Sequence, residues 1–359
     1  MTELARPEPD PALPAHPTGR ADVAAATTAD REMSDAARAR VAGGMADNTN
    51  RAYARDWETF TTWCATTGRT PLPASAETLA EYVTHLAATP TAHGTLPAPS
   101  TIERALACVQ SRHKKAGLTV NAEGGRLALR AYRKERAKTG TRTRKAPPAE
   151  LTVLRAMIDG CDPATLTGLR DRTALVLGFA LMGRRSELAA LDLEDLALTV
   201  DGLEVTIRQS KTDQDARGEV VPLPYGSHPE TCPVRVVQAW VAALAAQGVA
   251  AGPLLRGVDR HGRITTARPG ASGKSAERMS GHGLNLIVRR AAERAGLANA
   301  ETYTAHSLRA GGATSAAKHG APVSAIARHG RWSEKSPVVH GYIRTADKWR
   351  DNPMRGIGL

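Results

Sequence analysis

The chain has 359 residues, which is enough for two domains of ordinary size with a substantial core. Lysine and arginine number 48 against 36 aspartate and glutamate, so the formal net charge is +12 and the sequence pI is about 9.9. This positive excess indicates a polyanionic partner. Because no apolar run approaches the roughly 18 residues of a membrane-spanning helix and no signal peptide opens the sequence, we expect nucleic acid rather than a membrane surface.

The four cysteines lie far apart and form no Cys-x-x-Cys pair; they are Cys64, Cys108, Cys161 and Cys232. This spacing argues against a disulfide framework and against a structural zinc site. We therefore expect a protein of the reducing cytoplasm that carries no metal and no cofactor.

Composition separates a tail from a helical domain. Residues 1–45 are rich in Ala, Pro, Thr and Asp and have almost no large apolar side chains, so we expect them to be mostly disordered. In the next segment, DNTNRAYARDWETFTTWCATTG, helical spacing relates four positions: Tyr53, Trp57, Phe60 and Cys64. The pattern predicts a helix with a buried aromatic stripe.

Further helices are expected from the periodicity of SAETLAEYVTHLAA and STIERALACVQSRHKKAG. Ser100 and Glu103 form a capping-box pattern at the start of the second of these segments. A fourth helix is expected over residues 123–138. Together these segments predict a helical domain over residues 46–138.

The fourth helix and the linker that follows it, residues 139–148, are densely basic. Their positive residues are Arg126, Arg130, Arg133, Lys134, Arg136, Lys138, Arg142, Arg144 and Lys145. A charge run is commonly only a solvated helix face. Because this run coincides with a domain boundary, we expect it to lie along a phosphate backbone.

The second domain, residues 149–359, is expected to be mainly α with a small antiparallel β-sheet. GLRDRTALVLGFALMG is an apolar helix, and GHGLNLIVRRAAERAGL shows helical periodicity. Between them, Leu203, Val205 and Ile207 alternate with polar residues, and extended character resumes at VVPLP. This pattern predicts a β-hairpin.

The stretch AHSLRAGG places His306 and Arg309 three residues apart, so the two share one helix face. If the helix begins near Thr304, that face lies in its first turns, where unpaired backbone N–H groups and the helix dipole favour an anion. Taken alone, the pair is more simply a solvated His/Arg pair, because short motifs are weak evidence.

Further residues of the second domain change this interpretation. In chain order they are Arg184 in GRRSEL, Lys211 in SKTD, His306 and Arg309 in HSLR, and Trp332 and Tyr342 in GRWSEKSPVVHGYIR. The ordered set resembles the tyrosine recombinase (phage integrase) family. The helical domain is similar to the family's core-binding, SAM-like domain, and residues 149–359 are similar to its integrase catalytic domain.

Cutting a DNA strand without a metal ion requires a nucleophile, a proton for the leaving 5′-oxygen and fixed positive charge around the phosphate. The resemblance implies that Tyr342 attacks the scissile phosphate and forms a 3′-phosphotyrosine. It also implies that Arg184 and Arg309 hold the non-bridging oxygens and that Lys211 is the general acid. His306 is expected to handle the tyrosine proton or to hydrogen-bond the phosphate.

Trp332 is expected to donate its indole N–H to a phosphate oxygen and to pack against the helix of Tyr342. The two residues lie ten apart, one more than the family's commoner interval, and many members have histidine in place of Trp332. We expect the extra residue, with Pro337, to sit in the turn before the Tyr342 helix.

The spacing Arg-x-x-Glu selects Arg184 rather than Arg185 as the catalytic arginine, with Glu187 as its structural partner. Three histidines lie near the motifs in the sequence and are interpreted as surface or packing residues: His319, His329 and His340.

Three alternatives to a recombinase remain open. One is an inactive DNA-binding protein of the same fold, and another is a type IB topoisomerase, which shares the chemistry. The third is a metal-dependent nuclease, which needs clustered carboxylates. Asp192, Glu194 and Asp195 are grouped, but we expect them to be an acidic run at a helix end with which nothing pairs.

The sequence thus predicts a site-specific recombinase that integrates or excises a mobile element without metal or ATP. The expected partners are double-stranded DNA, accessory directionality factors and further copies of the chain in a tetrameric synapse on two DNA sites. The segment beyond Tyr342 carries apolar residues that are expected to dock on a neighbouring protomer: Trp349, Met354, Ile357 and Leu359.

Overall fold

A computed structural model describes residues 32–43, 47–92, 94–140, 146–208, 218–265, 277–347 and 352–357. The chain divides into two units, Met1–Thr143 and Arg144–Leu359, which are described separately here. The division falls inside the stretch 139–148 that the sequence indicates as a linker.

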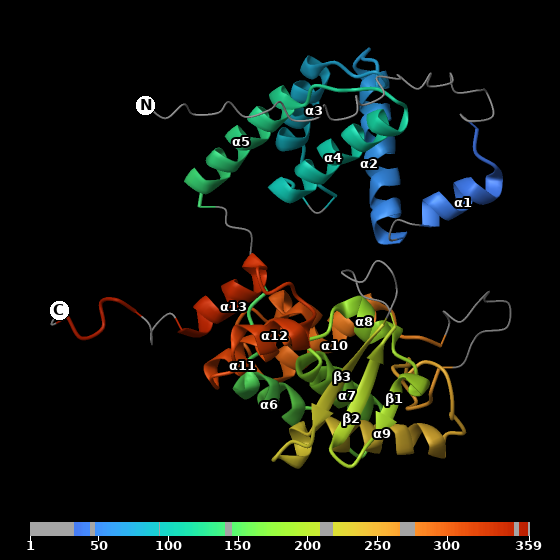
Figure 1. The fold of residues 1–359 in the computed structure, drawn as a ribbon, viewed down its shortest axis with the longest axis vertical. Coiled ribbons are helices and arrows are strands. Elements are labelled where there is room, and N and C mark those ends of the chain that lie inside the picture. The colour runs from blue at the N-terminus through green and yellow to red at the C-terminus, as the bar shows by residue number, and fades with distance from the viewer. Residues whose placement is uncertain are drawn as a thin grey trace, which may run out of the picture. The chain divides into compact units, whose positions relative to one another are not determined.

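The first unit is helical in its described part (Figure 1). Its helices are α1 (Asp35–Gly43), α2 (Asp47–Thr66), α3 (Ala76–Ala88), α4 (Pro99–Lys115) and α5 (Glu123–Lys138). Its core gathers the apolar faces of α2 to α5, with Phe60 of α2 packing edge-on against Tyr82 of α3 at a ring-centroid distance of 4.8 Å. Of the predicted stripe, Phe60 and Cys64 are fully buried and Trp57 packs half-buried against the core, whereas Tyr53 is half-buried and does not belong to this core cluster.

Two details of this unit differ from the expectations. Helix α1 falls within residues 1–45, which the sequence predicts to be mostly disordered; its segment DAARARVAG is built largely from strong helix formers. Residues 1–31, 44 and 45 lie outside the described residues. Helix α4 has no capping box, because Pro99 already occupies its first turn and Ala98 is the N-cap residue. Glu103 instead forms an ion pair with Arg133 of α5 at 2.9 Å.

The second unit combines helices with a sheet, which confirms the predicted fold class. Its α-helices are α6 (Leu151–Asp159), α7 (Leu166–Ala180), α8 (Arg185–Ala190), α9 (Pro233–Ala246), α10 (Gly281–Arg294), α11 (Ala305–Lys318), α12 (Val323–Gly330) and α13 (Pro337–Asp347). Its strands are β1 (Leu196–Leu198), β2 (Gly202–Ile207) and β3 (Glu219–Pro224), and short 3₁₀ helices lie at η2 (Leu193–Asp195), η3 (Pro229–Thr231) and η4 (Ala300–Thr302).

The described strands form an antiparallel sheet in the order β1-β2-β3, and Val205 of β2 lies opposite Val221 of β3. The alternation in β2 is as predicted, because Leu203, Val205 and Ile207 are all buried. The sequence reading missed β1, which has three residues and buries none of them fully, so it shows no alternation to detect. The segment 209–217 between β2 and β3 lies outside the described residues.

Helices α11, α12 and α13 pack on one another around a small apolar cluster that includes Ile326 and Val339. Figure 1 shows these helices, in orange to red, on one side of the unit and the strands on the other. The cluster is separate from the main core of the unit, to which α7, α9, α10 and the sheet contribute. It carries Trp332 and Tyr342 at its edge and so supports the site described next.

Candidate active site

Helix α11 begins at Ala305, after Thr304, as the sequence predicts. The backbone N–H of Thr304 donates to Ser307 Oγ at 3.1 Å, and the N–H of Ala305 donates to Asn285 Oδ1 at 3.1 Å. His306 is exposed, whereas Arg309, one turn later, is only 3% exposed. The start of this helix therefore presents an imidazole at the surface above a buried guanidinium.

The two glycines of AHSLRAGG allow α11 to touch other backbone segments directly. A Cβ atom on Gly311 would lie 1.9 Å from the carbonyl oxygen of Ala149, and one on Gly312 would lie 2.4 Å from the carbonyl oxygen of Phe179. A side chain at Gly311 would push α11 away from the segment before α6, and a side chain at Gly312 would push it away from the end of α7. The small residues thus bring Arg309 up to the turn that precedes Arg184.

Tyr342 lies on α13 of the same unit. Its Oη lies 3.1 Å from His306 Nε2, which is hydrogen-bonding distance. Its ring packs against Trp332 at a centroid distance of 5.6 Å and an interplanar angle of 59°. The structure therefore places the predicted nucleophile, its predicted proton partner and Trp332 side by side.

Arg309 is held from three directions. Its Nη1 donates to the carbonyl of Met182 and its Nη2 donates to the carbonyl of Gly330 at 2.7 Å. Its guanidinium also lies 3.9 Å from the centroid of the Trp332 ring, a cation–π arrangement. Burial, reinforced by repulsion from Arg184, lowers the pKa of Arg309 to about 9, so the group remains a cation at neutral pH.

Arg184 is the N-cap residue of α8, and the predicted pairing with Glu187 is present. Glu187 Oε1 accepts from Arg184 Nη1 at 2.6 Å, and Oε2 accepts from the backbone N–H of Arg184 at 2.8 Å. This double contact fixes both the backbone and the side chain of Arg184. Arg185 takes a different direction, with its side chain packed over Gly281 at the start of α10.

Sequence reasoning missed Arg331 and read His329 only as a surface or packing residue. Arg331 Nη2 donates to Glu187 Oε2 at 2.9 Å and to the carbonyl of Leu181 at 3.2 Å. His329 Nε2 donates to the carbonyl of Ala180 at 2.7 Å. The only sequence signal for either residue is its place in HGRW, directly before Trp332.

The surrounding protein partly desolvates both His306, which remains exposed, and the half-buried Tyr342, and this loss of hydration favours their neutral forms. It lowers the pKa of His306, and the nearby Arg309 cation lowers it further. It raises the pKa of Tyr342, and Arg309 partly opposes that rise. The site thus holds a neutral imidazole next to a neutral phenol, with a cation that favours the phenolate when the proton leaves.

The structure brings together Arg184, His306, Arg309, Trp332 and Tyr342. The sixth predicted residue, Lys211, lies outside the described residues. The expectation that Pro337 sits in the turn before the Tyr342 helix is wrong. Pro337 is the first residue of α13, a position where proline lacks only an N–H that would have no helical partner.

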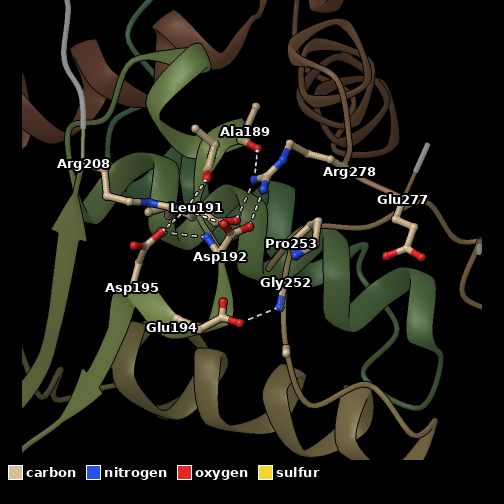
Figure 2. Close-up of polar contacts among 12 residues, drawn as sticks. Ala189, Leu191, Asp192, Glu194, Asp195, Arg208, Gly252, Pro253, Glu277 and Arg278 are labelled. Carbon is tan, nitrogen blue, oxygen red and sulfur yellow. Dashed lines mark hydrogen bonds and ion pairs between the residues drawn. The ribbon is translucent and has the colours of Figure 1, made fainter. Parts of the chain in front are cut away.

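The carboxylates after α8 are paired, contrary to the expectation that nothing pairs with them (Figure 2). Asp192 forms ion pairs with Arg208 and Arg278, and Asp195 accepts from Arg208 at 2.7 Å. Glu194 accepts from the backbone N–H of Gly252 at 2.9 Å. Among the described residues, no three metal-ligating side chains are grouped as a metal site requires. The carboxylates on which the nuclease alternative depends are therefore occupied by arginines and a backbone N–H.

None of the helices in the described part of the chain combines the length and apolarity needed to cross a bilayer.

Comparison with known proteins gives the relationships of the chain. Residues 150–348 match the model of the phage integrase family. The chain is 34% identical over 323 residues to an integrase/recombinase xerD homolog of Selenomonas ruminantium, covering 89% of this chain and 87% of the relative. It is 25% identical over 297 residues to the recombinase cre of Escherichia phage P1, covering 79% and 80%.

Two solved structures share the fold. The integrase of transposon Tn1549, in complex with transposon right end DNA, matches with a TM-score of 0.57 at 13% identity, covering 88% of this chain and 97% of that one. A lambda integrase dimer bound to a COC′ core site matches with a TM-score of 0.52 at 14% identity, covering 85% and 92%. Together with the family match and the xerD homolog, these findings show that the chain belongs to the phage integrase family and is a site-specific tyrosine recombinase.

Proposed function

We propose that the protein cleaves and rejoins DNA strands through a covalent 3′-phosphotyrosine at Tyr342. The observation that carries this proposal is the 3.1 Å contact between Tyr342 Oη and His306 Nε2 beside the buried Arg309. The phenol oxygen forms a bond to phosphorus, its proton passes to His306, and the bond from phosphorus to the 5′-oxygen breaks. Lys211 protonates that leaving oxygen.

The charge of the site supports a phosphate ligand. Three guanidinium groups, from Arg184, Arg309 and Arg331, surround the single carboxylate of Glu187. A guanidinium has five N–H donors, and Arg309 uses Nη1 and Nη2 on carbonyls while keeping further N–H groups on the same fork. Arg184 and Arg309 bind the non-bridging oxygens of the scissile phosphate and stabilise the charge that develops there. Trp332 donates its indole N–H to the phosphate.

The domains and partners follow from the same proposal. Residues 46–138 form the core-binding domain, residues 139–148 form a basic linker along the DNA backbone, and residues 149–359 form the catalytic domain. The substrate is double-stranded DNA of a mobile element that is integrated or excised, with accessory factors setting the direction. We place the reaction in the cytoplasm, a location supported by four free, buried cysteines.

We propose that the active assembly is a tetramer on two paired DNA sites. Tyr342 meets His306 within one chain, so each protomer brings its own nucleophile. An apolar groove of about 640 Å³ lies between β3 and the α11–α12 region of the same unit, and its lining includes Val220, Pro222 and Ile326. The groove supports docking of a C-terminal segment from a neighbouring protomer.

The test is the covalent adduct. Wild-type protein mixed with a nicked duplex that carries the target site should form a DNA–protein adduct in the presence of EDTA, and peptide mapping should find the DNA on Tyr342. Tyr342→Phe should bind the same duplex but form no adduct, because only the attacking oxygen is lost. An adduct with the phenylalanine variant, or a strict need for a divalent ion, would overturn the assignment.

Strand exchange separates a recombinase from a topoisomerase. Two paired target sites should give recombinant junctions with the wild-type protein. Relaxation of supercoils on any sequence, with no recombinant product, would favour the type IB topoisomerase alternative.

A further inference from the structure

The stretch from His329 to Trp332, which ends α12 and begins the connection to α13, contacts the site or the segments that support it. Gly330 offers its carbonyl to Arg309, and a Cβ atom on Gly330 would lie 1.9 Å from the Trp332 ring. Arg331 has a left-handed backbone with φ of 58°, which is uncommon for a residue other than glycine. This conformation sends the Arg331 side chain into the protein, while Trp332 stacks on Arg309.

Cationic or imidazole side chains bind consecutive carbonyls at the end of α7. His329 donates to Ala180, Arg331 to Leu181 and Arg309 to Met182. The last carbonyls of a helix have no partners within the helix, and cations are favoured at this end of the dipole. Side chains from α11 and from the end of α12 therefore hold the turn between α7 and Arg184 in place through hydrogen bonds.

Among these groups, Arg331 is the one joined to Glu187. The side chains of Arg331 and Glu187 are 1% and 2% exposed, and their ion pair is 2.9 Å long. Arg331 Nη1 also donates to the carbonyl of His329 at 3.0 Å. The planar Arg331 guanidinium thus binds Glu187, the carbonyl of Leu181 at the end of α7 and the carbonyl of His329. A lysine ammonium cannot reproduce this geometry.

Glu187 is shared between two arginines. Burial by itself raises the pKa of the Glu187 carboxyl, but the Arg331 cation and the hydrogen bonds from Arg184 bring it below its usual value. Oε2 accepts from Arg331 and from the backbone of Arg184, and Oε1 accepts from Arg184 Nη1. Without Arg331, the buried carboxylate would keep its hydrogen bonds to Arg184, whereas the more distant Arg309 acts on it through charge alone.

We propose that Arg331 is a positioning residue, which fixes Glu187 and the end of α7 so that Arg184 is aimed at one non-bridging oxygen of the scissile phosphate. The proposal rests on the proposed role of Arg184. Arg331 itself touches no substrate, since its fork is directed to Glu187, Leu181 and His329.

The test uses cleavage of nicked duplexes with a normal scissile phosphate or with either diastereomer of a methylphosphonate. Each diastereomer replaces one non-bridging oxygen by a methyl group and makes the linkage neutral, so the diastereomer that lacks the oxygen facing Arg184 should restore cleavage by Arg184→Ala. Arg331→Met should slow cleavage of the normal phosphate by roughly tenfold to a hundredfold, as expected for a misplaced catalytic group. The difference in cleavage rate between Arg331→Met and the wild type should be smaller on the diastereomer that rescues Arg184→Ala.

A matched control is Arg256→Met. Arg256 is another buried arginine of this unit, and it bonds Glu277 and the carbonyls of Ala251 and Pro253. This variant should cleave the three substrates with the same relative rates as the wild type, even if its thermal unfolding midpoint is lower. Arg331→Met should be compared with it at a temperature where both variants retain the wild-type circular dichroism and DNA binding.

If Arg331→Met does not fold, its effect can be measured in the Glu187→Gln background instead. Removing both members of a buried ion pair is tolerated better than removing one. Glu187→Gln and the double variant Glu187→Gln/Arg331→Met should therefore cleave at rates within about twofold of each other if Arg331 acts through Glu187. Arg331→Lys should recover only part of the loss, because an ammonium lacks the fork.

Two results overturn the proposal. One is a folded Arg331→Met protein that loses cleavage equally on all three substrates, or loses none. The other is a further tenfold loss when Arg331→Met is added to Glu187→Gln. Failure of both diastereomers to rescue Arg184→Ala would instead count against the proposed role of Arg184, so the two failures are distinguishable.

Discussion

Tyr342 Oη and His306 Nε2 lie 3.1 Å apart, and partial desolvation disfavours the charged form of each side chain. Moving the proton from the phenol to the imidazole creates two charges in a partly dehydrated site. Arg309 lowers the pKa of Tyr342 and so supports the phenolate, but it also lowers the pKa of His306 and so opposes the imidazolium. A bound phosphate changes this balance, because its negative charge stabilises the imidazolium.

The pH dependence of cleavage should follow His306, which accepts a proton only when it is neutral. Its ordinary pKa of 6.5 is lowered, so it stays neutral above pH 6.5 and the rate should fall only below that pH. Single-turnover cleavage measured from about pH 5 to 8 checks this expectation. His306→Gln should cleave more slowly, and its rate should no longer fall at acidic pH. If the rate of the wild-type enzyme instead falls already above pH 6.5, the lowered pKa of His306 is contradicted.

The two arginines that we propose to bind the scissile phosphate should not tolerate lysine. Arg184→Lys and Arg309→Lys keep the positive charge but lose the planar fork that binds both a phosphate oxygen and a fixed protein acceptor. We expect each to slow cleavage by roughly a hundredfold or more, as for the loss of one transition-state donor. Binding to the intact site, measured by electrophoretic mobility, should change little; a parallel loss of binding would indicate a role in the ground state.

At the level of elements, ion pairs fix the end of β2, the last described part of the chain before the predicted general acid. Lys211 follows β2, whose neighbouring residue Arg208 is tied to Asp192 and Asp195 (Figure 2). Asp192 also pairs with Arg278, just before α10. The end of β2 is therefore joined by ion pairs to the acidic run after α8 and to the segment that leads into α10.

Lys211→Ala should fail at the step that expels the 5′-oxygen. A substrate with a 5′-bridging phosphorothiolate has a leaving group that needs no proton, so it should restore cleavage by this variant. Arg184→Ala should gain no comparable benefit, since it removes charge at the non-bridging oxygens. Equal rescue of both variants, or of neither, would remove Lys211 from the general-acid role.

At the scale of the whole molecule, the segment beyond Tyr342 has no chemical task within its own domain. Met354 and Ile357 are 55% and 58% exposed, although both are large apolar residues. The groove along β3 and α12 offers apolar surface for such side chains. We propose that this segment is exchanged between protomers, which would be a heterologous contact of the kind that closes into a ring.

Truncation after Asp347 should spare binding to a single DNA site and abolish synapsis and strand exchange. The free protein should sediment largely as a monomer, and the tetramer should form only on two paired sites. Met354→Ser/Ile357→Ser keeps the chain length and should weaken synapsis in the same direction. Recombination by the truncated protein at the wild-type rate would count against the exchange, and circular dichroism verifies that the variant is folded.

The sequence by itself determined the features that depend on local spacing. Periodicity predicted most of the buried face of α2 and the alternation of β2, because in each case a short segment packs against one core. The helix expected over residues 123–138 coincides with α5. Local spacing also placed His306 and Arg309 in the first turns of α11. The family resemblance added the order of the catalytic residues.

Only the tertiary structure decided which groups pair across long sequence separations. Arg331 reaches Leu181 and Glu187, about 150 residues earlier, because its backbone is left-handed and the end of α12 lies against the end of α7. Asp192 meets Arg208 and Arg278 for a similar reason: the run after α8 is enclosed by β2 and by the approach to α10. Local spacing cannot encode such pairings, since they arise only when separate elements are packed together and buried charges must find partners.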